Sequence, residues 1–275
     1  MISCNDILTF DRIDDIEDNS ELRRGSPATH VVFGTPQAIN TANYLFVKAL
    51  EEVRRLSPSA IEIYIDELRY LHIGQGLDLH WTFHAECPSE LDYIRMIDGK
   101  TGGLFRMASR LMRAHATCNR NLEVEDLFTI FGRYFQIRND YQNLCSEDGA
   151  MSDLDEGKYS FILIHGLQHA KDGQLRSLVR QRCKQGMLSG AQKGLVMKQL
   201  NRTKSLEYAT MVLQELQVEF ENKLQALEST IDASKGKNWI IRAIMRRLAV
   251  KVPKFQDFDT IPEPKPQESP EGPRV

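Results

Sequence analysis

The chain has 275 residues, 41% of them hydrophobic, and a formal net charge of -3 at pH 7. This length suits one large domain with an ample core, and the nearly balanced charge gives no bias towards nucleic acid. No apolar run approaches the roughly 20 residues that a membrane-spanning helix needs. Five cysteines without any Cys-x-x-Cys pair predict reduced thiols in a soluble, cytoplasmic protein.

The first informative segment is acidic and reads Asp14-Asp15-Ile16-Glu17-Asp18. On a helix, Asp14 and Asp18 lie one turn apart on the same face, with Asp15 beside them. Like charges at this spacing repel, so the segment needs a cation or a basic partner. Hard oxygen ligands on one face suit Mg²⁺, which usually shares its coordination shell with substrate phosphates. A solvated acidic turn is the alternative interpretation.

A basic pair, Arg23-Arg24, follows the acidic segment directly. Guanidinium groups bind phosphate through two parallel hydrogen bonds. Carboxylates for a metal and arginines for phosphate, so close together, indicate a site for a metal-bound diphosphate.

The body of the chain is predicted to be all-α. Only four of the ten prolines precede residue 253, and apolar residues recur three and four apart over residues 104–116, 127–144 and 206–227. Alternating runs typical of strands, with hairpin dipeptides between them, are absent. We therefore expect one helical domain over residues 1–252. The last segment, 253–275, holds six prolines and is predicted to be a disordered tail.

Three further polar segments lie within or between the predicted helices. Their sequences are Lys100-Thr101-Gly102-Gly103, Gln136-Ile137-Arg138-Asn139-Asp140-Tyr141-Gln142-Asn143 and Asp153-Leu154-Asp155-Glu156-Gly157-Lys158. A lysine before two glycines, or in a loop, is by itself most simply a surface residue. The middle segment differs, because it crowds too many short polar groups into an apolar-spaced helix to be ordinary filler.

Taken in order, these segments resemble the short-chain trans-prenyl diphosphate synthases of the geranylgeranyl diphosphate synthase type. Residues 14–25 resemble the first aspartate-rich motif of that family, and residues 135–144 resemble the second. Gln75-Gly76-Leu77-Asp78 resembles the helix segment that faces the first motif. The resemblance covers roughly residues 13–230 and implies an isoprenoid synthase-type helical bundle with a central cavity for diphosphate and magnesium.

The resemblance also implies a role for each matching residue. Metal ligands would be Asp14, Asp15, Asp18, Asn139 and Asp140, with Mg²⁺ as the cofactor. The allylic diphosphate would be bound by Arg23, Lys100, Thr101, Gln136, Asn143 and Lys158, and isopentenyl diphosphate by Arg24. The family usually has aspartate at position 139, so the neutral amide of Asn139 should weaken the metal site. The implied reaction joins isopentenyl diphosphate to farnesyl diphosphate, giving geranylgeranyl diphosphate, and the implied assembly is a homodimer.

Residues 1–12 resemble none of the family's N-terminal helices, which bind isopentenyl diphosphate. We therefore expect a chain shortened at this end, for which three interpretations stay open: a truncated sequence, an inactive subunit that acts with a partner synthase, and a divergent enzyme. A class I terpene cyclase is a further alternative, because Asn139, Asn143 and Glu147 have the spacing of that class's metal-binding triad.

The segment 239–254 combines apolar residues with five basic ones. It is interpreted either as a helix that lies on a membrane surface or as a last helix with a solvated basic face. The terminal Pro273-Arg274-Val275 departs in every position from the peroxisomal signal Ser-Lys-Leu, which gives peroxisomal targeting only weak support.

Overall fold

The computed structural model describes residues 12–23, 25–145, 151–185, 187–231 and 237–250, and these are nearly all helical. Residues 12–17 form a short helix that ends in a turn. The elements that follow in chain order are β1 (Leu22–Arg23), β2 (Ser26–Pro27), α2 (Thr29–Phe33), α3 (Thr35–Arg54), α4 (Pro58–His84), α5 (Glu90–Lys100), α6 (Gly102–His115), α7 (Glu125–Leu144), α8 (Ser152–Glu156), α9 (Phe161–His169), α10 (Gln174–Gln185), α11 (Gly190–Arg202), α12 (Ser205–Thr230) and α13 (Trp239–Leu248). The all-α fold class is therefore confirmed.

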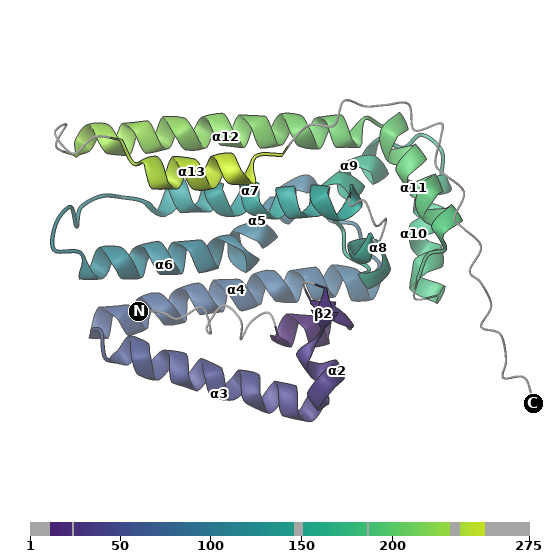
Figure 1. Cartoon of the computed structure of the whole chain (residues 1–275). Helices are drawn as coiled ribbons and strands as arrows, with labels where there is room; N and C mark the ends of the chain where they lie inside the picture. Colours follow the sequence, from purple (N-terminus) through teal and green to yellow (C-terminus); the bar gives the residue numbers. More distant parts are fainter. Residues whose placement is uncertain (1–11, 24, 146–150, 186, 232–236, 251–275) are drawn as a thin grey trace, which may run out of the picture.

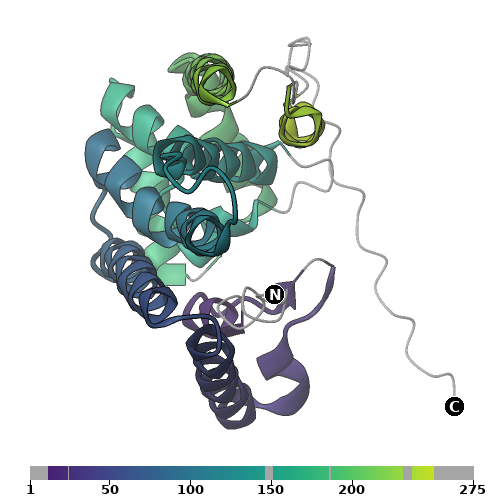
Figure 2. The ribbon, with the colours of Figure 1, turned by 90° about the vertical axis from the view of Figure 1, so that its left-hand side faces the viewer.

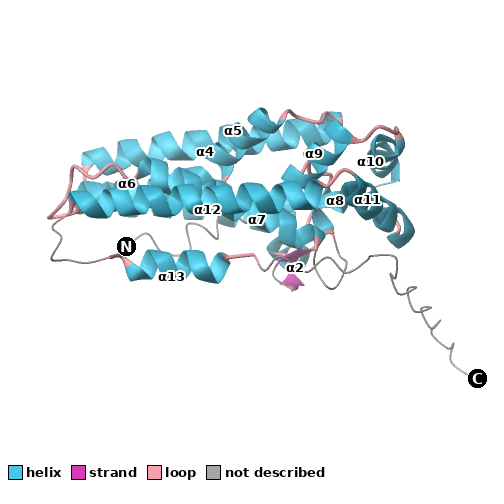
Figure 3. Ribbon diagram, turned by 90° about the horizontal axis from the view of Figure 1, so that it is seen from above, coloured by secondary structure: helices cyan, strands magenta, loops and turns pink. Residues whose placement is uncertain are grey.

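The long helices α4, α6, α7 and α12 run side by side and form the body of the bundle (Figure 1). In the end-on view, α3 lies across α4 from the rest of the bundle, and α13 lies at the edge beside α12 (Figure 2). The short helices α10 and α11 sit together at one end of the long helices (Figure 3).

The hydrophobic core is continuous through α5, α7, α9 and α12. The short helix α9 is almost entirely buried in this core, and its Ile162, Leu163 and Ile164 have no exposed surface. A helix that is apolar all round is stable only when other elements surround it. A second, smaller cluster packs α3 against α4 and α6 through Val53, Tyr64 and Leu111.

The three helices predicted from apolar spacing are confirmed as α6, α7 and α12. Several helices begin at a residue whose side chain accepts a hydrogen bond from the first turn. Ser57 caps α4, Ser160 caps α9, and Ser189 with Gln192 forms a capping box on α11. These caps satisfy backbone N–H groups that have no partner within the helix.

The sequence did not predict the two-residue hairpin of β1 and β2, in which Arg23 pairs with Ser26. Gly25 adopts a φ of 78°, a conformation that glycine reaches without a side-chain clash. Arg23, on the first strand of this hairpin, lies over Asp15.

Within the described residues, no helix has the length and hydrophobicity needed to cross a membrane. The predicted tail, 253–275, lies outside the described residues. The boundary at residue 252, the homodimer and the cytoplasmic location remain predictions.

Candidate functional site

The acidic segment has the helical geometry that its spacing predicted. The backbone N–H of Asp18 donates to the carbonyl of Asp14 at 2.8 Å, so the two carboxylates lie one turn apart. Asn19 then adopts a φ of 55°, a left-handed conformation that asparagine tolerates, and the helix ends there. Asp15 is 5% exposed, so the segment is packed into the protein and is not a solvated acidic turn.

Three cations from separate elements contact these carboxylates. Arg23 Nε lies 3.0 Å from Asp15 Oδ1. Lys100 Nζ, at the end of α5, lies 3.3 Å from Asp14 Oδ1. Lys158, which follows α8, lies 2.5 Å from Asp18 Oδ2. The structure therefore brings together six of the predicted site residues from segments up to 144 positions apart.

Two residues of α4 complete this network, although neither was among the predicted ligands. Gln75 Nε2 donates to Asp14 at 2.9 Å and to Glu17 at 2.8 Å. Lys100 also lies 2.7 Å from Asp78 Oδ2. The signal for both was their sequence segment, which resembles the family helix that faces the first motif.

A close crossing of α4 and α5 sets the position of Lys100. A Cβ atom on Gly74 would lie 2.5 Å from the backbone nitrogen of Lys100 and 2.7 Å from the carbonyl oxygen of Met96. Only glycine allows the two helices to approach this closely. Gln75 and Asp78 lie next to this crossing on α4. Gln75 therefore contacts Asp14, as Lys100 does, and Asp78 contacts the ammonium group of Lys100.

The electrostatics of the network follow from burial and neighbouring charge. Burial raises the pKa of Asp18 to about 6, because its effect, reinforced by Asp14, exceeds the opposing effect of Lys158. Burial also acts to raise the pKa of Asp14, but the nearby cations, Lys100 first, lower it below its usual value.

Burial acts to lower the pKa values of Lys100 and Lys158, but neighbouring carboxylates raise both. Both lysines are therefore charged at neutral pH. The site therefore pairs two charged lysines with carboxylates, and a bound polyanion would compete for the same ammonium groups.

The second predicted motif forms a hydrogen-bonded chain on α7. Thr101 Oγ1 donates to Gln136 Oε1 at 2.7 Å, and Gln136 Nε2 donates to Asp140 Oδ1 at 3.0 Å. Asp140 Oδ2 accepts from the Tyr93 hydroxyl at 2.6 Å and from the backbone N–H of Phe161 at 2.8 Å. Both oxygens of Asp140 thus have protein donors, and burial raises its pKa. Its role as a metal ligand remains a prediction, as does that of the half-buried Asn139.

Asn143 connects the end of α7 to α8. Its Nδ2 donates to Ser152 Oγ at 2.8 Å, and its Oδ1 accepts from the backbone N–H of Asp153 at 3.2 Å. This contact supplies the start of α8 with an acceptor that its own N-cap residue lacks. The predicted contact of Asn143 with diphosphate remains untested. In the cyclase alternative, Glu147 lies outside the described residues.

Asp153 belongs to the same region, and sequence reasoning did not select it. Burial, with Asp140 as the largest neighbouring charge, raises its pKa to about 7. The only signal for it was its place in the segment that ends at Lys158.

The loop that carries Lys158 is fixed by several contacts. Gly157 has a φ of 95° and packs against Thr82 and Arg182. Glu156 accepts from Ser20 Oγ at 2.7 Å and lies 2.8 Å from Lys158 Nζ. The loop is thus bound to the turn that follows the first acidic motif. Arg24, the predicted isopentenyl diphosphate ligand, lies outside the described residues.

The donor set at this site fits magnesium in its chemistry. The available groups are hard oxygens: the carboxylates of Asp14, Asp15 and Asp18, and the buried Oε1 of Gln75, which has no hydrogen-bond partner among the described residues. Within those residues, no group of three or more histidine, cysteine, aspartate or glutamate side chains is arranged to hold a metal ion by itself. Magnesium in proteins is usually held by one or two carboxylates together with substrate phosphates.

Comparison with known proteins identifies a matching family model and several related sequences. The family model for polyprenyl synthetase matches residues 12–192. The chain is 46% identical over 247 residues to a bifunctional sesterterpene synthase, astC, from Talaromyces wortmannii, covering 87% of this chain and 32% of the relative. It is 45% identical to the preasperterpenoid A synthase PvPS of Talaromyces verruculosus (86% of this chain, 31% of the relative).

A conidiogenone synthase of Penicillium roqueforti is 44% identical, with 86% of this chain and 32% of the relative covered. The chain thus spans about a third of the length of these curated relatives. The matched residues include the first and second aspartate-rich segments, and they also include Lys100 and Lys158. On this match and these identities, the chain belongs to the polyprenyl synthetase family.

Proposed function

We propose that this chain joins isopentenyl diphosphate to an allylic prenyl diphosphate, with farnesyl diphosphate as the preferred allylic substrate and Mg²⁺ as the cofactor. The observation that carries the proposal is the network of Asp14 and Asp18 with Lys100 and Lys158. It sets two half-buried ammonium groups beside two oxygen ligands of the kind that magnesium uses.

The residues of the chain act by binding and neutralising charge. Arg23, Lys100 and Lys158 contact the allylic diphosphate and stabilise the negative charge that grows as it leaves. Asp14, Asp15 and Asp18 would hold magnesium, with Asn139 and Asp140 on the second motif. When bound, the metal withdraws electrons from the diphosphate oxygens. As the substrate enters, the lysines exchange their carboxylate partners for phosphate oxygens.

The reaction balances without a side-chain base. The C–O bond of the allylic diphosphate breaks, and the double bond of isopentenyl diphosphate forms a new C–C bond to the resulting cation. The proton then lost passes to the departing diphosphate. The products are a prenyl diphosphate longer by five carbons and inorganic diphosphate.

The name of one relative suggests a length for the prenyl product. The names of the relatives describe terpene synthases, one of them a sesterterpene synthase, whose products have 25 carbons. A twenty-carbon geranylgeranyl diphosphate is the product we propose, and a further addition would give the 25-carbon diphosphate.

The experiment is incubation of the purified chain with Mg²⁺, isotope-labelled isopentenyl diphosphate and farnesyl diphosphate, followed by mass identification of the products. A labelled 20- or 25-carbon diphosphate, lost in Lys158→Gln and kept in Lys223→Gln, supports the proposal. Lys223 is the matched control because it forms an exposed ion pair with Asp126 away from the site. A folded chain that makes no prenyl diphosphate would contradict it.

One observation favours a second candidate, a synthase-like subunit that needs a partner. Asn139 supplies no charge where the family usually has aspartate, so metal affinity at this position should be lower. Under this candidate, the chain alone is inactive but changes the rate or product of an added synthase. The same assay with a second prenyl diphosphate synthase distinguishes the two.

A further inference from the structure

The last described helix, α13, is oriented with a charged residue inward and large apolar residues outward. Arg242 is 5% exposed, whereas Trp239 is 61% and Ile240 75% exposed. The apolar face of an amphipathic helix usually covers the core. The expectation of a last helix with a solvated basic face is therefore wrong for Arg242, and the outward apolar residues need an explanation.

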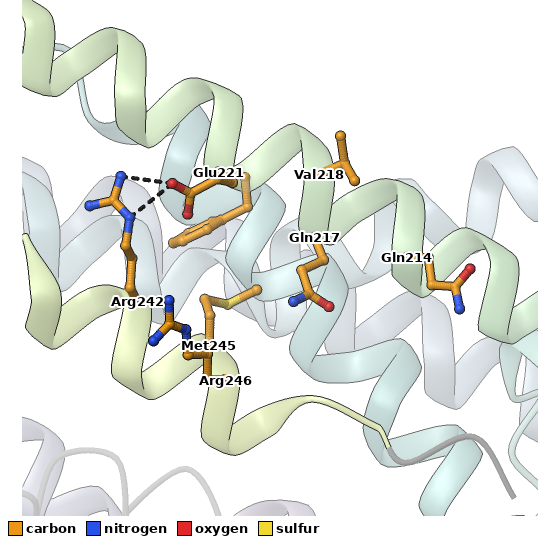
Figure 4. A pocket seen from close by; sticks show the side chains of 8 residues that line it. Gln214, Gln217, Val218, Glu221, Arg242, Met245 and Arg246 are labelled. Atoms are coloured by element: carbon orange, nitrogen blue, oxygen red, sulfur yellow. Dashed lines mark hydrogen bonds and ion pairs between the residues drawn. The ribbon is translucent and has the colours of Figure 1, made fainter.

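Specific contacts hold α13 in this orientation. Arg242 lies 2.8 Å from Glu221 of α12 (Figure 4). It also contacts Glu228, further along the same helix. Met245 packs into the core beside Arg242. At the end of the helix, the carbonyl oxygen of Leu248 accepts from Arg138 at 2.6 Å and from the Tyr134 hydroxyl at 3.2 Å. Contacts with both α12 and α7 thus fix which face of α13 points away from the bundle.

The outward face combines apolar surface with positive charge. Trp239 and Ile240 are exposed at the start of the helix, Ile244 is exposed near its middle, and Arg246 and Arg247 are exposed near its end. The helix has no acidic residue. The two glutamates nearest to it on α12 are already paired with Arg242. The exposed Val218 of α12 lies across a shallow groove from Met245 and Arg246 (Figure 4).

From this combination we propose that the outer face of α13 is a binding surface for an anionic phospholipid membrane. A helix lying in a membrane interface inserts large apolar side chains such as Trp and Ile, while arginines reach the lipid phosphates. Charge complementarity favours this occupant, because α13 exposes Arg246 and Arg247 and carries no carboxylate of its own. The helix end is hydrogen-bonded to Arg138, one residue before Asn139 on the motif helix. Membrane binding by this face does not depend on the activity of the candidate site.

Trp239 reports this binding directly, because the chain has only one other tryptophan, the buried Trp81. The test adds vesicles of phosphatidylcholine, with and without 30% phosphatidylserine, to the full chain and follows fluorescence and co-sedimentation. We expect a blue shift in the emission that grows with phosphatidylserine and is absent in Trp239→Phe. No shift and no co-sedimentation, or equal binding to neutral vesicles, would overturn the proposal.

Matched variants distinguish vesicle binding through this face from non-specific adsorption of the chain. Ile240→Ser with Ile244→Ser should weaken vesicle binding at least about tenfold, because two apolar side chains that would enter the membrane interface are replaced by polar ones. The control, Ile65→Ser with Ile73→Ser, changes two similarly exposed isoleucines on α4 and should bind as the wild type does. Arg246→Gln and Arg247→Gln should each weaken binding about fivefold, with the loss greatest at low salt. Equal binding by the α13 and α4 variants would contradict the assignment.

A protein occupant of the same face gives a different result. If a second copy of the chain covered it, the Ile240→Ser and Ile244→Ser variant would dissociate an oligomer in light scattering, and the wild type would not bind vesicles. That outcome overturns the membrane proposal.

Discussion

The Nζ atom of Lys158 lies 2.5 Å from Oδ2 of Asp18, across 140 residues of sequence, and joins the second half of the site to the first. The shifted pKa values of this pair are the basis of the first prediction.

Asp18→Asn should separate stability from activity. The folded-state pKa of Asp18 is raised to about 6 from 3.8, so the protonated carboxyl stabilises the fold below pH 3.8 and this contribution is lost as the pH rises through 6. The neutral Asn avoids this loss at pH 7.5. Asn also removes the carboxylate that most raises the pKa of Lys158, and this loss opposes the gain. We expect the free energy of unfolding to change by less than about 1 kcal/mol in urea denaturation, while kcat/KM falls at least about 100-fold through loss of a metal ligand.

The control for this prediction is Asp66→Asn, which changes an exposed carboxylate paired with Arg69 on α4. It should alter neither quantity appreciably. Parallel losses of stability and activity in Asp18→Asn would mean that Asp18 has a structural role and is not a functional ligand.

The crossing of α4 and α5 predicts opposite effects for two neighbouring glycines. Gly74→Ala places a methyl group against the backbone of Lys100 and should lower the free energy of unfolding by about 2–3 kcal/mol. Gly76→Ala, two residues further along the same helix, meets no atom within 4 Å and should raise it by about 0.5–1 kcal/mol. Chemical denaturation of both variants is the measurement, and an equal response would show that the helices do not cross so closely.

Asn139→Asp should strengthen metal dependence. An added charge beside Asp140 attracts Mg²⁺ and should lower the magnesium concentration for half-maximal activity about fivefold to tenfold. Without metal, the same charge repels the neighbouring carboxylates, so the variant should unfold at a lower temperature and recover when magnesium and inorganic diphosphate are added. A magnesium titration that is unchanged from the wild type would remove Asn139 from the metal site.

His165 predicts a loss of stability in mild acid. Its ring stacks between His169 and Tyr208, with centroids 4.1 and 4.3 Å away, and its Nδ1 contacts Ser205 Oγ at 2.9 Å. Burial, and then His169, lower its pKa. A lowered pKa means that the unfolded chain takes up the proton first, so stability falls as the pH drops below 6.5, by at most about 1.4 kcal/mol per pH unit.

The difference between the wild type and His165→Asn isolates this contribution from other titrating groups. The free energy of unfolding should depend less steeply on pH in this variant. His84→Gln, which changes an exposed histidine, should keep the pH dependence of the wild type. Identical slopes in all three proteins would contradict the assignment.

Local sequence patterns predicted three of the helices, and the family resemblance named the candidate site residues, but neither showed how those residues pair. Apolar spacing located α6, α7 and α12, and the spacing of Asp14 and Asp18 set their shared face. The pairing of Lys100 with Asp14 depends on the crossing at Gly74, which no local pattern encodes. The inward turn of Arg242 was missed for a similar reason, since glutamates on another helix determine it. Tertiary contacts decide such features, and a single sequence does not show them.

The central claim is that Asp14, Asp18, Lys100 and Lys158 form a site for a magnesium-bound diphosphate. Calorimetric titration of the chain with inorganic diphosphate, with and without Mg²⁺, tests it most directly and does not depend on the length of the product. We predict binding that is at least about tenfold tighter with Mg²⁺, a magnesium effect that disappears in Asp18→Asn, and weak binding in Lys158→Gln. Binding that is independent of magnesium, or unchanged in both variants, would contradict the claim.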